Sequence, residues 1–172
     1  MSTDAAILAE IDTAFGAVER PEHFTNFAHC EECAEHDDLL RARDRYTLRI
    51  EDVGNPGWDP ICFCSPNGIA YYFPTLARLA LAEQGSNKYD WYANQLLFHL
   101  YSGFTDNAFF QHCNIAQRRV VARFLAHIIE TRTSLIAVYG SADDFLRCHE
   151  LWNNAQPTAP EGRSADKPAP RP

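Results

Sequence analysis

Apolar residues recur every three or four positions along most of the chain, a spacing that predicts helices rather than strands. Ser65 is a good helix N-cap because its hydroxyl can accept a hydrogen bond from the first turn. Pro66 then suits the first helical position, where the missing N–H group costs nothing. The clearest apolar stripe begins after Asn114, a good capping residue, and extends to about Tyr139. The expected helices cover about residues 4–19, 30–45, 65–84, 89–101, 114–139 and 141–152.

The segment between the second and third expected helices has a weaker pattern. Residues 46–53 alternate weakly between apolar and polar side chains, which predicts a short strand or another helical turn, and Gly54-Asn55-Pro56-Gly57 is a strong turn signal. This predicts an irregular patch or a short β structure near residues 46–64. The predicted fold class is therefore mainly α, a single globular domain of about six helices.

The pattern changes again after Trp152. Residues 153–172 contain five prolines and no large apolar residue other than proline. Such a segment cannot bury enough apolar surface to offset the entropy of ordering. The sequence predicts a helical domain over residues 1–152 and a flexible Pro/Ala-rich tail over residues 153–172. A length of 172 residues suits one such domain.

Composition and charge limit the expected cellular location and the classes of binding partner. The formal net charge is −8, and an acidic surface repels phosphate backbones, so no nucleic-acid partner is expected. The first residues lack the charged start and apolar run of a signal peptide. No stretch approaches the roughly 20 apolar residues that span a bilayer. We therefore expect a cytoplasmic protein with no membrane partner, whose six cysteines are thiols or metal ligands.

The densest chemistry lies in residues 29–38, which hold two thiols, two imidazoles and five carboxylates. Cys30, Cys33 and His36 have the spacing C-x-x-C-x-x-H, and these donor types bind zinc. Each three-residue step on an ideal helix turns the side chain by about 60°, so all three cannot converge neatly on one straight helix. The cysteines are therefore expected in a loop or at a helix N-terminus, with His36 one turn further on.

Zinc needs about four ligands, so a fourth donor has to come from another position or from water. Cys62 and Cys64 are the best distant candidates, and with Cys30 and Cys33 they would form an all-thiolate site. Two histidines, at positions 23 and 29, are local alternatives. The sequence leaves this choice open.

Several fragments resemble an uncharacterised bacterial family of small helical proteins, classed as a domain of unknown function. The resemblance covers roughly residues 5–152 and includes the Cys30-x-x-Cys33 step. It implies a small helical domain but no activity and no catalytic residues. The other fragments that carry it are the -I-x-x-A-F-x-x-V-x-R-P- stretch at 11–21, Phe63-x-Ser65-Pro66, Ala70-Tyr71-Tyr72-Phe73-Pro74, the arginine-rich late helix, and Leu151-Trp152.

These observations together predict a non-catalytic protein-binding module with one structural zinc site. Thiolate-rich ligation makes zinc a poorer Lewis acid, and the sequence contains no H-E-x-x-H motif. Two alternatives stay open. One is a small metal-dependent hydrolase that uses His36 and neighbouring carboxylates. The other is a thiol redox protein that uses Cys30 and Cys33.

Overall fold

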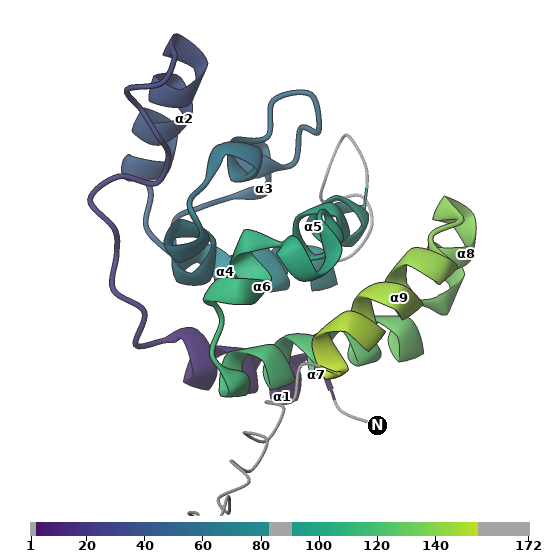
Figure 1. Cartoon of the computed structure of the whole chain (residues 1–172). Coiled ribbons are helices and arrows are strands. Elements are labelled where there is room, and N and C mark those ends of the chain that lie inside the picture. Colours follow the sequence, from purple (N-terminus) through teal and green to yellow (C-terminus); the bar gives the residue numbers. More distant parts are fainter. Residues whose placement is uncertain (1–2, 83–90, 155–172) are drawn as a thin grey trace, which may run out of the picture.

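The computed structural model describes residues 3–82 and 91–154, and these residues fold into helices, with a long irregular segment over residues 16–30 between the first two (Figure 1). The predicted fold class is confirmed as mainly α, but the described residues form nine α-helices, not about six, and seven of these have seven or more residues. The elements are α1 (Asp4–Phe15), α2 (Glu31–Arg41), α3 (Ile50–Val53), the 3₁₀ turn η1 (Pro60–Phe63), α4 (Pro66–Leu81), α5 (Tyr92–Tyr101), the 3₁₀ turn η2 (Phe104–Asp106), α6 (Ala108–His112), α7 (Ile115–Thr131), α8 (Thr133–Tyr139) and α9 (Ala142–Asn153).

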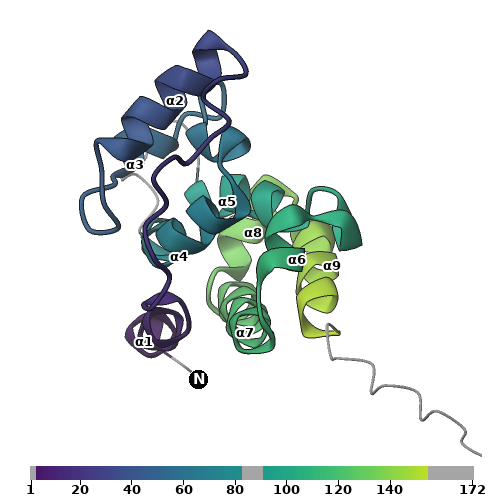
Figure 2. The ribbon, with the colours of Figure 1, turned by 60° about the vertical axis from the view of Figure 1, so that its left-hand side comes forward.

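Helix α4 is the centre of the core, and twelve of its sixteen residues are buried. It packs against α1, α5 and α6, while α7 packs against α1 and α9. Phe73 of α4 lies between Phe15, Phe109 and Phe124, with ring centroids 4.7, 5.6 and 5.9 Å away. Helix α2 lies outside this bundle and packs against η1 (Figures 1 and 2).

Local capping rules predicted several helix starts correctly. The Ser65 hydroxyl accepts from the Gly68 N–H, with Pro66 in the first turn. Asn114 and Gln117 form a reciprocal capping box at the start of α7. The first helix is shorter than predicted, since it ends at Phe15 and not near residue 19.

The predicted single helix over residues 114–139 is wrong, because the chain leaves helical geometry at Arg132 and begins α8 there. The Arg132 guanidinium donates to the Leu81 carbonyl (3.0 Å) and to Asp4 (2.7 Å). The side chain at the break thus contacts two segments that are distant in the sequence, and the local hydrophobic pattern does not predict these contacts.

Of the alternatives predicted near residues 46–64, the short β structure is not found among the described residues, whereas the irregular character and a helical turn within residues 46–53 are confirmed. This region contains α3 and η1, and the pairing found among the described residues is one isolated bridge between Thr25 and Cys64. Bidentate hydrogen bonds of 2.9 Å from Arg43 to Asp52 hold together the segment between α2 and α3. The predicted tail lies, from residue 155 onward, outside the described residues, and so does the predicted end of the third helix near residue 84. No helix in the described ranges has the length and apolarity needed to cross a membrane.

Candidate metal centre

Three donor atoms meet at the N-terminus of α2. Cys30 caps this helix, and its Sγ accepts from the Cys33 N–H at 3.4 Å. The two Sγ atoms are 3.2 Å apart, and His29 Nδ1 lies 3.6 Å from Cys33 Sγ. Zinc bond lengths of about 2.3 Å to sulfur and 2.0 Å to nitrogen give tetrahedral edges of about 3.5–3.8 Å. Small side-chain rotations would therefore let His29, Cys30 and Cys33 bind one ion.

This group is open to solvent. His29 and Cys30 are exposed, whereas Cys33 is buried. It contains three donor atoms that lie within 4.8 Å of one another. A tetrahedral ion held by these three would keep one coordination position for a further ligand.

The surroundings shift the pKa values of the two thiols in opposite directions. The Cys33 N–H, the Cys33 thiol and His29 all stabilise a thiolate at Cys30, and this lowers the pKa of Cys30. The pKa of Cys33 is raised by its hydrogen bond with Cys30, by burial and by the nearby negative charge. Cys30 is therefore the first of the pair to become a ligand or a nucleophile.

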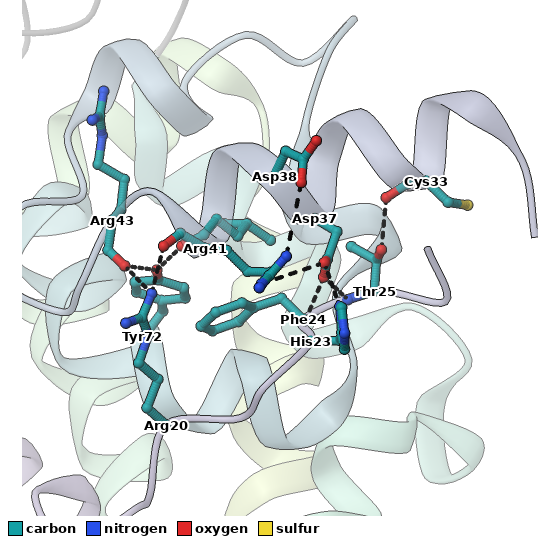
Figure 3. Close-up of polar contacts among 11 residues, drawn as sticks. Arg20, His23, Phe24, Thr25, Cys33, Asp37, Asp38, Arg41, Arg43 and Tyr72 are labelled. Carbon is teal, nitrogen blue, oxygen red and sulfur yellow. Dashed lines mark hydrogen bonds and ion pairs between the residues drawn. The ribbon is translucent and has the colours of Figure 1, made fainter. Parts of the chain in front are cut away.

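The segment before α2 is held by Asp37, independently of any ion (Figure 3). Asp37 Oδ1 accepts from the N–H groups of Phe24 (2.7 Å) and Thr25 (3.1 Å), and Oδ2 bonds His23 Nδ1 at 2.7 Å. The Thr25 hydroxyl donates to the Cys33 carbonyl at 2.7 Å. Burial opposes ionisation of Asp37, but His23 and the two N–H groups outweigh it and lower its pKa.

The C-terminus of α2 is held in a similar way (Figure 3). The Tyr72 hydroxyl contacts the carbonyls of Leu40 (2.6 Å) and Arg43 (3.1 Å). The Arg20 guanidinium donates to the carbonyls of Arg41 (2.6 Å) and Arg43 (2.9 Å). These contacts satisfy carbonyls that the helix itself leaves free. Both ends of α2 are thus attached to the rest of the protein by hydrogen bonds.

His36, a predicted ligand, is placed in an aromatic contact and not in the His29–Cys30–Cys33 group. Its ring lies 4.6 Å from the rings of Trp58 and Phe63, and it is fully buried. Neither ring nitrogen has a hydrogen-bond partner among the described residues. The Glu32 carboxylate lies 3.8 Å from Nε2, an ion-pair contact that is too long for a hydrogen bond.

If the His29–Cys30–Cys33 group binds zinc, we predict that His36→Phe leaves the zinc affinity unchanged, and that it does not destabilise the protein. A buried imidazole without hydrogen bonds costs about 1–3 kcal/mol, so an apolar ring between Trp58 and Phe63 should be neutral or stabilising. Chelator competition and urea unfolding measure the two effects. A large loss of zinc affinity would instead make His36 a ligand, as the sequence suggested.

The structure also separates the two cysteine pairs. Among the described residues, Cys62 belongs to a second group with Asp59 and His99, and Cys64 belongs to neither group. Cys64 is packed so closely against α4 that a Cβ added at Gly68 would lie 2.6 Å from its Sγ. Burial raises the pKa of the Cys64 thiol. The all-thiolate arrangement is therefore not assembled in this structure.

Sequence reasoning missed Asp59 and His99. His99 lies in an apolar helical stretch, where a lone histidine is usually a core residue. Asp59 precedes a proline, three residues before Cys62, and so has the position of a helix cap. Only the spatial contact between η1 and α5 reveals the group.

The chain matches no protein-family model, no curated protein and no solved structure. The resemblance to an uncharacterised bacterial family therefore stays a prediction, and a function can be inferred from the geometry of the sites alone.

Proposed function

We propose that the protein binds one zinc ion through His29, Cys30 and Cys33, and that the ion presents its fourth position to a protein partner. The supporting observation is the convergence of these three donors within 4.8 Å on the outer end of α2. Two thiolates and one imidazole form a neutral complex with Zn²⁺. They also donate charge to the metal, which favours a binding role over Lewis-acid catalysis.

The surroundings of this site suit a protein partner. Phe27 and Trp58 are 45% and 41% exposed, and both contact histidines of this region, at positions 23 and 36. Large exposed aromatic side chains are frequent anchors in protein interfaces. The exposed face of α2 carries four carboxylates, so the favoured partner surface is basic. The carboxylates are Glu31, Glu32, Glu35 and Asp38.

Metal binding is tested by competition between the apo protein and a chromophoric zinc chelator. We expect one zinc ion at this site. Cys33→Ser should lower its affinity at least about 100-fold, because replacing even a residue that only hydrogen-bonds to a metal ligand costs about 10–100-fold in affinity. Cys64→Ser removes a thiol outside both metal groups and is the matched control. Equal affinity in the wild-type protein and Cys33→Ser would refute the assignment.

The open position is tested with Co²⁺, whose visible absorption reports its ligands. Free imidazole added to the Co²⁺-loaded Cys62→Ser variant, which lacks a donor of the second group, should shift the absorption bands if the fourth position is exchangeable. An unchanged spectrum would mean that the chain itself closes the site, and the partner-binding role would be withdrawn.

A second candidate function is dithiol exchange, favoured by one observation: an exposed Cys30 sulfur lies 3.2 Å from a buried Cys33 sulfur at a helix N-terminus. The Cys30 thiolate would attack oxidised glutathione and release one glutathione thiolate. The Cys33 thiolate would then attack the mixed disulfide and release the second. Rapid formation of a Cys30–Cys33 disulfide in a protein that retains no zinc would favour this function over metal binding.

A further inference from the structure

We propose that Asp59, Cys62 and His99 form a second site for a divalent ion of the zinc class, independent of the group at α2. Asp59 caps η1, Cys62 lies within η1, and His99 lies in the last turn of α5. One donor atom from each lies within 4.8 Å of the other two. Carboxylate, thiolate and imidazole are all zinc ligands, and three protein ligands with one open position characterise catalytic sites.

The donors are held in place by other contacts. Asp59 Oδ1 accepts from the Ile61 N–H at 2.9 Å, which fixes the carboxylate. Asp59 Oδ2 lies 2.7 Å from His99 Nε2, and both side chains are nearly buried. A metal-bound Asp59 would keep its Oδ1 hydrogen bond, while Oδ2 and His99 Nε2 would exchange the hydrogen bond between them for bonds to the ion.

The arrangement differs from that of a Cys–His–Asp nucleophilic relay. In a relay, imidazole lies between the acid and the thiol, so the two are separated by two hydrogen bonds of about 3 Å plus the ring. Here a carboxylate oxygen and the Cys62 sulfur lie within 4.8 Å of each other. The three groups therefore converge on one point, as metal ligands do.

A hydrogen bond between Asp59 and His99 alone does not provide a partner for the neighbouring side-chain oxygen of Gln95. Gln95 donates to Asp59 Oδ2 (2.6 Å) and to the Val53 carbonyl (2.7 Å). Its Oε1 is buried and, among the described residues, has no hydrogen-bond partner. Such an acceptor needs a donor, and a water bound to the metal would provide one.

A cavity of about 290 Å³ adjoins this group. Asp59 and Cys62 contribute to its wall, together with Gln95 and the half-exposed ring of Phe98. The fourth coordination position would therefore face a space large enough for a small molecule with an oxygen donor. This site has one thiolate where the α2 group has two, so its ion would be the stronger Lewis acid.

The test uses the full chain carrying Cys30→Ser and Cys33→Ser, which disables the first group. We expect this protein to bind one equivalent of Co²⁺ with a thiolate charge-transfer band, and Zn²⁺ to displace it. Adding Cys62→Ser should abolish the band and lower the affinity at least about 100-fold, by the same reasoning as above. Cys62 is exposed, so this change should leave the fold intact. Cys64→Ser is the control and should bind like its parent.

The outcomes separate the two sites. If the double serine variant binds no metal while the wild-type protein binds one ion, the second site is refuted and the α2 site stands. If the double serine variant binds one ion and the wild-type protein binds no more, the α2 site fails. His99→Asn gives a further check, because it should weaken binding while circular dichroism stays helical. Binding unaffected by either Cys62→Ser or His99→Asn would overturn the proposal.

Discussion

Replacing Asp37 with alanine is expected to lower the free energy of unfolding by about 3 kcal/mol, because it leaves two buried N–H groups without acceptors. These groups belong to Phe24 and Thr25, and His23 loses its partner as well. Phe24 is fully buried against Tyr72, so the loss should spread into the core. Urea unfolding followed by circular dichroism measures the change.

Asp38→Ala is the matched control, since Asp38 is the next residue on α2 and its side chain is 82% exposed. Its ion pair with Arg41 is 3.9 Å long, and exposed pairs of this kind contribute less than about 1 kcal/mol. Similar losses in the two variants would mean that α2 is not held by the Asp37 contacts.

The same carboxylate makes stability depend on pH. The pKa of Asp37 lies below its ordinary 3.8, so the folded state binds fewer protons than the unfolded state near that pH. Its contribution is complete above about pH 3.8 and is lost as the pH falls through the lower, folded-state pKa. Between neutral and acid pH, the free energy of unfolding should therefore fall less in Asp37→Asn than in the wild-type protein.

These contacts change the expected role of the ion at α2. A zinc ion bound by His29, Cys30 and Cys33 would close a loop of only five residues, and short closures add little stability. Asp37 and Tyr72 already attach the two ends of α2. We therefore infer that metal removal leaves the fold intact and changes mainly what the exposed end of α2 can bind.

The sequence predicted best those features that depend on contacts between residues close together in the chain. The caps at Ser65 and Asn114 involve residues three positions apart, so local rules find them. At the break, Arg132 contacts Asp4 and Leu81, which are far away in the chain, and periodicity carries no information about such contacts.

The same distinction applies to the candidate sites. Cys30 and Cys33 could be paired from spacing alone, because one turn of backbone joins them. His36 continued the spacing but points into an aromatic contact, and His29, a local alternative, completes the group. His99 could not be found, because it is 40 positions from Asp59 and meets it only through tertiary packing.

Trp152→Ala is expected to cost about 4 kcal/mol, since truncating a fully buried tryptophan leaves a large cavity. Its ring lies 5.6 Å from Phe109 and 5.1 Å from Phe110, and its Nε1 donates to the Leu100 carbonyl at 2.9 Å. The change therefore removes packing and also leaves a buried carbonyl with one fewer donor. Thermal and urea unfolding both report the loss.

Leu146→Ala is the control for this prediction, because Leu146 lies on the same helix and is 54% exposed. Its truncation should change stability by less than about 1 kcal/mol. Trp152→Phe keeps much of the apolar contact but removes the Nε1 donor, so it should lie between alanine and the wild type. If Trp152→Ala were as mild as Leu146→Ala, α9 would not be part of the folded core, and the domain boundary predicted at residue 152 would have to move toward the N-terminus.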